Sequence, residues 1–160
     1  MRNEILKLLE VDSRLTVKEL AVMLGLDEAA VAADIKAMEK ENIICGYHTM
    51  IDWDKVAEES VTALIEVKVT PQREQGFDKI AEHIYQFDEV SSVYLIAGAY
   101  DFTVILQGKT LKEVSRFVSE KLATLDSVIG TATYFVLKKY KDHGVVFSSK
   151  KQDERLAIIP

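Results

Sequence analysis

Hydrophobic residues in the first forty positions recur at the spacing of three amphipathic helices. The first helix is predicted over residues 3–11. Thr16, with Glu19 three positions later, has the capping-box pattern that begins a second helix, and Gly25 is a favoured residue at a helix end. Asp27 begins the third helix. The side chains predicted to face inward are those of Ile5, Leu6, Leu8, Leu9, Val17, Leu20, Ala21, Leu24, Val31, Ile35 and Met38.

Two helices joined by a short turn after a glycine are typical of the helix-turn-helix motif, whose later helix reads DNA. The following residues 43–53 (IICGYHTMIDW) alternate like a short hairpin, or wing. A plain three-helix bundle has the same helical period, so this pattern alone leaves both interpretations open.

From residue 61 the hydrophobic period changes to two, and strands begin to alternate with amphipathic helices. Residues 61–69 predict a half-buried strand closed by Pro71, and Thr110 caps the last helix. The predicted order is strand, helix, strand, strand, helix and strand, over residues 61–69, 76–87, a pair within 90–108 joined at 98–101, 111–125 and 129–140. The helical residues predicted inside are Phe77, Ile80, Ala81, Ile84, Tyr85, Leu111, Val114, Phe117, Val118 and Leu122.

This order predicts an α+β protein: an N-terminal winged helix-turn-helix domain of three helices and a C-terminal ferredoxin-like βαββαβ domain, with four antiparallel strands and both helices on one face. The other sheet face would be uncovered and partly apolar. Such a face predicts a homodimer, because a two-fold axis lets one patch meet itself. The predicted organisation is a helix-turn-helix domain (1–50), a linker (51–60) anchored by Trp53, the sheet domain (61–138) and a tail (139–160).

Composition narrows the classes of function. The chain has 160 residues and a net charge of −6, which argues against general binding to polyanions. No apolar run reaches the ~18–20 residues of a membrane span, and no signal-peptide pattern opens the chain, so the cytoplasm is expected. Cys45 cannot form an internal disulfide. No metal or cofactor is expected, because His48, His83 and His143 share no ligand spacing and are expected at the surface.

Two stretches carry a resemblance to a known family. They are EILKLLEVDSRLTVKELAVMLGL (4–26) and GAYDFTVILQG (98–108), the second lying between two predicted strands. Over residues 3–138 the chain resembles the Lrp/AsnC family, the leucine-responsive or feast/famine transcriptional regulators of bacteria and archaea. The resemblance implies double-stranded DNA as a partner and dimers formed through the sheet domain, often four dimers in a ring. It also implies an amino acid effector bound between sheet domains.

The predicted reading helix departs from that family. Its members typically present arginines where this chain has Ala33, Asp34 and Ala37, so bidentate arginine–guanine contacts are missing there, and an aspartate near phosphate would repel it. Small side chains can instead meet thymine methyl groups, and lysines can meet phosphate or guanine. The predicted DNA contacts are Thr16, Ala29, Ala32, Ala33, Lys36 and Lys40.

Two interpretations of this helix remain. It binds DNA weakly and reads shape and methyl groups, helped by avidity and by bases elsewhere in the chain. Alternatively, the domain has lost operator binding, and the protein is an effector-sensing assembly module. The intact caps, turn and inward stripe favour the first interpretation.

The connection between the two middle strands is the predicted effector site. Gly98 suits a tight connection with a positive φ, and it also lets a ligand carboxylate approach backbone N–H groups. Asp101 either caps a turn or accepts the α-ammonium group of an effector, and the resemblance favours the second role. Tyr100 packs on a strand or forms a pocket wall. Thr131 and Thr133 are β-branched residues that suit any strand, but the resemblance places their strand beside the pocket.

An enzyme is not predicted. The sequence has no G-x-S-x-G elbow, phosphate-binding loop or paired metal motif. Siroheme decarboxylases share this two-domain architecture, but their sheet domain carries a stretch with histidine and arginine. The matching stretch here, VSSVYLIAGAYD (90–101), has neither residue.

Residues 138–160 form a basic end, with six bases and three acids. Chain ends are usually solvated and frayed, but two apolar clusters argue against full exposure. The tail is therefore predicted to dock beside a helix-turn-helix domain, where Lys150, Lys151 and Arg155 would supply phosphate contacts. The clusters are Val145, Val146 and Phe147, and Leu156, Ile158 and Ile159.

Overall fold

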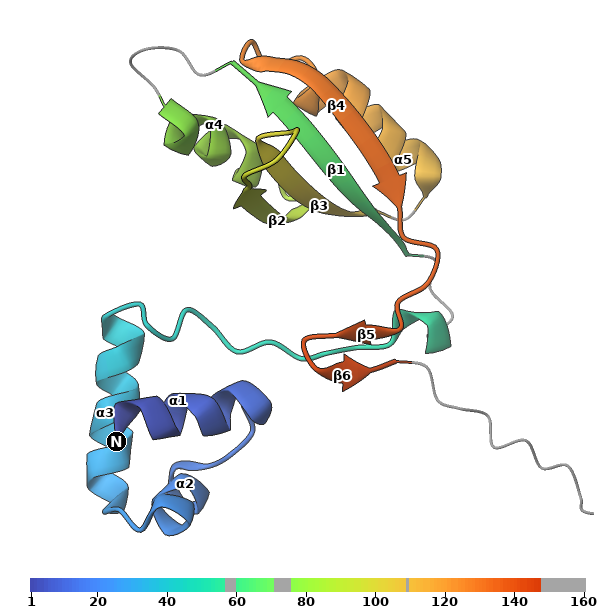
Figure 1. The fold of residues 1–160 in the computed structure, drawn as a ribbon. Coiled ribbons are helices and arrows are strands. Elements are labelled where there is room, and N and C mark those ends of the chain that lie inside the picture. The colour runs from blue at the N-terminus through green and yellow to red at the C-terminus, as the bar shows by residue number, and fades with distance from the viewer. Residues whose placement is uncertain (57–59, 71–75, 109, 148–160) are drawn as a thin grey trace, which may run out of the picture. The chain divides into compact units, whose positions relative to one another are not determined.

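The computed structural model describes residues 1–56, 60–70, 76–108 and 110–147. The chain divides into two units, residues 1–51 and the residues from 52 onward (Figure 1). No helix within the described ranges is long and apolar enough to cross a membrane.

The first unit confirms the three predicted helices, which are α1 (Arg2–Val11), α2 (Val17–Leu24) and α3 (Glu28–Lys40). They pack around the residues that the helical period places inside. The buried residues are Ile5, Leu20, Ala21, Val31 and Met38, and the predicted residues packed against them are Leu6, Leu8, Leu9, Val17, Leu24 and Ile35.

Local hydrogen bonds fix the start of α2 and the turn between α2 and α3. The backbone N–H of Glu19 donates to Thr16 Oγ1 (3.2 Å), and the backbone N–H of Thr16 donates to Glu19 Oε2 (2.8 Å), which completes the capping box. Gly25 ends α2 with a φ of 64°, a left-handed conformation that glycine adopts without strain. Asp27 caps α3 by accepting the N–H of Ala30 (3.0 Å). These predicted caps are confirmed.

Residues 43–53 do not form the predicted hairpin. Ile43 and Ile44 both donate their N–H to the carbonyl of Met38, which closes the end of α3, and residues 45–52 then have no strand partner in the described part of the chain. Alternation predicts a backbone with two faces, but a hairpin also needs a second strand in register. Trp53 follows in a short 3-10 helix, η1 (Trp53–Lys55), at the start of the second unit.

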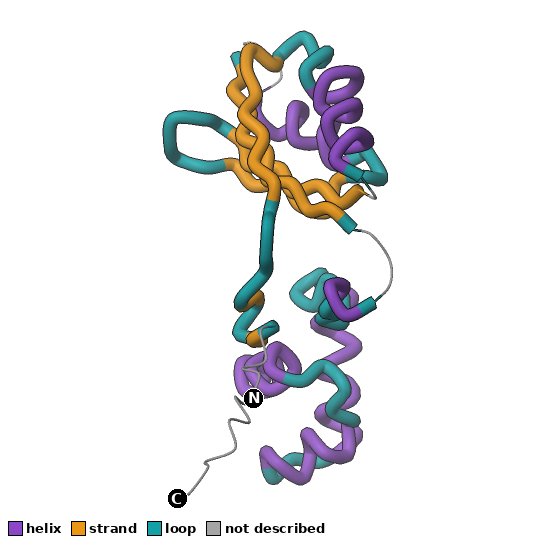
Figure 2. Tube along the Cα trace, turned by 90° about the vertical axis from the view of Figure 1, so that its right-hand side faces the viewer, coloured by secondary structure: helices purple, strands orange, loops and turns teal. Residues whose placement is uncertain are grey.

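The second unit confirms the predicted ferredoxin-like arrangement. Its main sheet is antiparallel with strand order β2-β3-β1-β4. Figure 2 shows both helices on one face of that sheet. The elements are β1 (Val61–Val69), α4 (Gly76–Tyr85), β2 (Val90–Leu95), β3 (Phe102–Gly108), α5 (Leu111–Phe117), a π-helical turn η2 (Val118–Leu122) and β4 (Val128–Phe135). Pro71, predicted to close β1, lies outside the described residues.

Strand β1 determines which side chains meet the helices. Every second residue of β1 from Ala63 is buried, and the residues between them are partly buried on the other face. Directly opposite residues of antiparallel strands point to the same face, so Ile65 shares its face with Val104 of β3 and Thr133 of β4. The buried core is Ala63, Ile65, Val67, Val69, Ile80, Ile84, Phe102, Val104, Leu106, Val114, Phe117 and Leu122.

Two residues predicted inside this core are exposed. The exposed fraction is 58% for Tyr85 and 55% for Leu111. Tyr85 is the last residue of α4 and Leu111 the first residue of α5. The helical period gives the direction of a side chain but not the point at which the covering sheet ends. At both helix ends the apolar stripe therefore continues into solvent.

After β4 the chain forms a small hairpin of β5 (Lys141–Asp142) and β6 (Val145–Val146). In the first predicted tail cluster only Phe147 is buried, at 9% exposed, with Lys139 Nζ lying 5.3 Å from its ring centroid. Both valines of β6 are exposed, so the cluster is not buried as a group. Docking of the tail stays a prediction. Outside the described residues lie Lys150, Lys151, Arg155, Leu156, Ile158 and Ile159.

Candidate DNA-reading surface and effector loop

The exposed side of α3 contains most of the predicted DNA contacts. Their spacing repeats with the helical period, so they form one stripe, which we call the α3 stripe. Thr16 is also exposed, but its hydroxyl already serves the cap of α2, where it donates to Glu19 Oε2 (2.8 Å). A DNA phosphate would compete with Glu19 for that hydroxyl. The α3 stripe consists of Ala29, Ala32, Ala33, Lys36 and Lys40, all exposed.

The aspartate that was expected to repel phosphate is paired with an arginine of α1. Arg2 Nε donates to Asp34 Oδ1 (3.2 Å), and Arg2 Nη1 donates to Oε2 of Glu41 (3.0 Å), the residue directly after α3. The hydrogen bond to Asp34 is the main cause of the raised pKa of Arg2. The Asp34 side chain is only 16% exposed, and its Oδ2 accepts no hydrogen bond from the described residues. Arg2 is therefore the counter-charge of Asp34, whose carboxylate is mostly covered.

Other carboxylates of the first unit are also engaged. Glu39 accepts a hydrogen bond from the hydroxyl of Tyr47 (2.9 Å), and Asp12 is paired with Arg14 (2.9 Å). Four lysines, by contrast, are exposed and form no ion pair with any described residue. The unit is acidic in sum, but its free positive charges lie on its surface. These lysines are Lys7, Lys18, Lys36 and Lys40.

The connection between β2 and β3, residues 96–101, is the effector loop predicted from the sequence. Figure 2 shows it projecting from the sheet on the side away from the helices. The N–H of Ile96 donates to the carbonyl of Asp101 (2.9 Å), which closes the loop. The N–H of Asp101 donates to the carbonyl of Val67 (3.0 Å), which ties the loop to β1.

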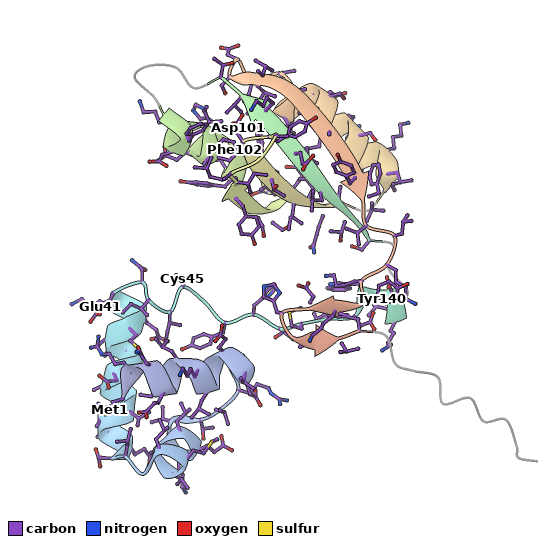
Figure 3. The ribbon with its side chains drawn as sticks, viewed as in Figure 1. Met1, Glu41, Cys45, Asp101, Phe102 and Tyr140 are labelled. Carbon is purple, nitrogen blue, oxygen red and sulfur yellow. The ribbon has the colours of Figure 1, made fainter. Side chains whose placement is uncertain are left out.

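The carboxylate of Asp101 supports an irregularity of β1 (Figure 3). The pairing of β1 with β4 shifts between Lys68 and Val69. The N–H of Val69 donates to Asp101 Oδ2 (2.9 Å), and Lys68 Nζ lies 3.4 Å from the same oxygen. The bond from Val69 first, and then the ammonium of Lys68, lowers the pKa of Asp101. Asp101 therefore holds the loop onto β1, and its role toward a ligand stays a prediction.

Gly98 does not have the positive φ expected from a tight connection. A Cβ added there would meet only the side chain of Ile96, at 4.0 Å. Neither backbone conformation nor crowding therefore requires glycine at this position. The lack of a side chain at Gly98 leaves the exposed backbone of the loop accessible to a ligand.

One chain does not bring the five predicted effector residues together. Gly98, Tyr100 and Asp101 belong to the loop on the open face of the sheet. The two threonines of β4 point to the opposite, helix-covered face, because each stands opposite a buried residue of β1. The pairs are Thr131 with Val67 and Thr133 with Ile65. Within a single chain the sheet itself separates the loop from the threonines.

Arg2 and Lys68 are the charged residues of these sites that the sequence analysis missed. Each contacts an acid more than thirty positions away along the chain. Periodicity detects neighbours within one helix or strand, but not partners on separate elements. The only sign of these ion pairs in the sequence was the presence of basic residues in segments that are otherwise acidic. His48, His83 and His143 are exposed, as predicted.

The depressed pKa of Asp101 gives a pH-dependent contribution to stability. A carboxylate whose pKa is lower in the folded state stabilises the protein above its unfolded pKa, about 3.9, and loses that effect as the pH falls through the folded value. We expect Asp101→Asn to be less stable than the wild type at pH 7. The difference in the free energy of unfolding should shrink below pH ~3.9. Denaturant unfolding across a pH series measures it, with the exposed Asp126→Asn as control. A difference that is constant with pH would contradict this assignment.

Comparison with known proteins supports both units. Residues 2–44 match the winged helix-turn-helix DNA-binding domain, and residues 62–146 match the Lrp/AsnC ligand binding domain. The chain is 49% identical over 158 residues to the uncharacterised HTH-type transcriptional regulator YugG of Bacillus subtilis, covering 98% of this chain and 95% of that one. It is 31% identical over 127 residues to a proline dehydrogenase transcriptional activator of Rhodobacter capsulatus, covering 79% and 82%.

Solved structures share the fold. The leucine response regulatory protein of Mycobacterium tuberculosis aligns with a TM-score of 0.76 at 19% identity, covering 92% of this chain and 97% of that one. A transcriptional regulator of Neisseria meningitidis, solved in complex with L-methionine, aligns with a TM-score of 0.70 at 23% identity, covering 88% and 90%. With both domain matches in order along the sequence, the chain belongs to the Lrp/AsnC family of transcriptional regulators.

Proposed function

We propose that this protein binds DNA through the α3 stripe and that an amino acid, bound between sheet domains, changes its DNA affinity. The observation that carries the proposal is the charge arrangement of the first unit. Arg2 forms ion pairs with both Asp34 and Glu41, whereas Lys36 and Lys40 remain exposed beside alanines. A surface of this kind can contact phosphates with its lysines and thymine methyl groups with its alanines.

The α3 stripe predicts binding of low sequence specificity. It contains no arginine for bidentate contact with guanine. Two lysines supply two phosphate contacts per protomer, and assembly into dimers multiplies them by avidity. DNA shape and deformability then contribute a larger share of the specificity than contacts to base edges do.

A second function is favoured by the same scarcity of bases. If the protein has lost operator binding, it is an effector-sensing module that assembles with related chains. Asp34 stands where family members typically carry an arginine, and this departure is the feature that supports such a module. DNA binding that does not respond to the lysines of the α3 stripe would favour it.

The effector is proposed to bind where the loop of one chain meets another chain. Asp101 can accept an α-ammonium group, and the exposed backbone at Gly98 can donate to a carboxylate, with Tyr100 as a wall. Thr131 and Thr133 point to the helix-covered face of each sheet, so a pairing of open sheet faces does not bring them to the loop, and only a different contact between copies would add them to the site. The relative solved with L-methionine supports an amino acid as the class of effector.

A dimer through the open sheet face is proposed because that face carries apolar side chains and no helix covers it. The register places Leu64, Ile105 and Tyr134 on the face away from the helices, and Tyr134 is 53% exposed. The hydroxyl of Tyr134 donates to Glu66 (3.2 Å) in the middle of that face. An apolar surface with satisfied polar groups suits a self-complementary interface.

Replacing a lysine of the α3 stripe should weaken DNA binding in a salt-dependent way. We expect Lys36→Ala to lower affinity and to reduce the slope of log affinity against log salt by about 0.9 for each phosphate that the variant no longer neutralises. Fluorescence anisotropy with a labelled duplex across a salt series measures both quantities. Lys7→Ala, an exposed lysine of α1, is the matched control and should change neither. Equal effects of the two substitutions would count against the α3 stripe.

Removing the counter-charge of Asp34 should weaken DNA binding without removing a DNA contact. Arg2→Ala leaves the carboxylates of Asp34 and Glu41 uncompensated beside α3. We expect affinity to fall about two- to fivefold near 0.1 M salt, within the usual energy of an exposed ion pair, and less at higher salt. The double variant Arg2→Ala/Asp34→Asn should recover part of the loss. No recovery in a normally folded double variant would show that Arg2 acts in another way.

A charge on the open sheet face should separate the protomers. Leu64→Glu adds a carboxylate on the same face as Glu66, two positions along β1. We expect the full-length wild type to be a dimer or a larger assembly by light scattering at micromolar concentration, and this variant to be a monomer. Thr70→Glu, an exposed substitution just beyond β1, is the control. A monomeric wild type would overturn the proposed interface.

A further inference from the structure

A cavity of about 600 Å³ lies at the opposite end of β3 from the effector loop. Strand β3 begins at Phe102, beside that loop, and ends at Gly108, in the wall of the cavity. Leu106, Val114 and Phe117 form its apolar floor, and the indole of Trp53 adds an aromatic wall. Its volume is within the range of small-molecule sites, roughly 300–1,000 Å³.

A fixed positive charge lies at the edge of that floor. Lys121 Nζ donates to Glu89 Oε1 and lies 5.5 Å and 5.6 Å from the ring centroids of Phe87 and Phe117. The two rings contact each other edge to face, with centroids 5.3 Å apart. This bond to Lys121 is the main cause of the lowered pKa of Glu89. An ammonium has three donors, and Glu89 takes one of them.

The geometry of α5 brings charges of both signs to the same rim. Arg116 and Glu120 line the cavity one helical turn apart, and their charged atoms are separated by 3.9 Å. The helix changes to a π-helical turn at Val118–Leu122, which includes Glu120 and Lys121. Single π-helical turns inside α-helices occur frequently at functional sites.

We propose that this cavity is a second ligand site, which takes a free α-amino acid with an apolar or aromatic side chain. The carboxylate would lie against Lys121 and Arg116, and the ammonium against Glu120. The side chain would lie on the floor between Trp53 and Phe117. A zwitterion needs both charges close together above an apolar surface, and the lining provides that combination. The inference rests on the proposed role of amino acids as effectors, but it uses residues remote from the loop.

Trp53 makes occupancy of the cavity measurable. It is the chain's single tryptophan, so indole fluorescence reports on this wall alone. We expect L-phenylalanine or L-leucine to change its emission saturably, with a dissociation constant on the order of millimolar or tighter. N-acetyl-L-phenylalanine lacks the ammonium and L-phenylalanine amide lacks the carboxylate, so each should bind at least about tenfold more weakly. No response to either amino acid, or equal responses to the derivatives, would overturn the proposal.

Variants of α5 and η2 test the assigned groups. Arg116→Gln and Lys121→Gln should each weaken the fluorescence response about tenfold, whereas Lys112→Gln, an exposed lysine of the same helix outside the lining, should not. Lys121→Gln also loses its bond to Glu89, so its thermal unfolding without ligand is measured as well. Arg116 is 65% exposed and its replacement should not disturb folding. An unchanged response in a folded Arg116→Gln variant would contradict the site.

The Asp101→Ala variant separates this site from the effector loop. It should leave the Trp53 response intact, because Asp101 stands at the other end of β3. Loss of the response in a folded variant would show that the indole reports the loop site, and the cavity proposal would fall. If the Trp53 response persists while Lys36→Ala leaves DNA binding unchanged, the proposed DNA-reading surface is wrong and the cavity proposal still holds.

Discussion

Burial along β1 is the constraint on which the second unit depends. Alternate residues of this central strand, among them Ile65 and Val67, are fully buried against the helices. Each such side chain contributes roughly 1.5–3 kcal/mol relative to leaving it exposed. A slip of one residue would exchange the two faces, so the register is fixed by burial. The opposite residues of β1 then form the open face by necessity. The effector loop projects on that side, and hydrogen bonds of Asp101 to the backbone of Val67 and Val69 hold it to β1.

Charge in the first unit is arranged by pairing rather than by composition. A sum over residues 1–50 gives more acids than bases, yet at physiological salt a charge acts only within about a Debye length, ~8–10 Å. On the proposed DNA-reading surface, Lys36 and Lys40 are exposed and form no ion pair with a described residue, whereas Asp34 and Glu41 are paired with Arg2. Net charge is therefore a poor guide to what a single surface binds, whereas the partners of each carboxylate are a good one.

The three helices of the first unit and the βαββαβ order of the second could be predicted, because each element depends on local pattern such as the capping box at Thr16. The predictions that were wrong depend on contacts between residues that are far apart along the chain. Residues 43–53 alternate but have no partner strand among the described residues. The candidate sites were less predictable still. The sheet face to which Thr133 points depends on the register between β4 and β1. The ion pair of Arg2 and Asp34 depends on how α1 packs against α3. Each of these facts is tertiary, and each changes the chemistry assigned to a residue.

The two proposed ligand sites differ in what they can regulate. A ligand changes DNA affinity only if it binds two states of the protein unequally, and the coupling is reciprocal. A site formed where the loop of one chain meets another chain exists only in the assembly, so its effect must depend on protein concentration. The cavity is built within one protomer, and Trp53 belongs to the segment directly after the first unit. A ligand there would act on the connection between units in each chain, whether or not the assembly has formed.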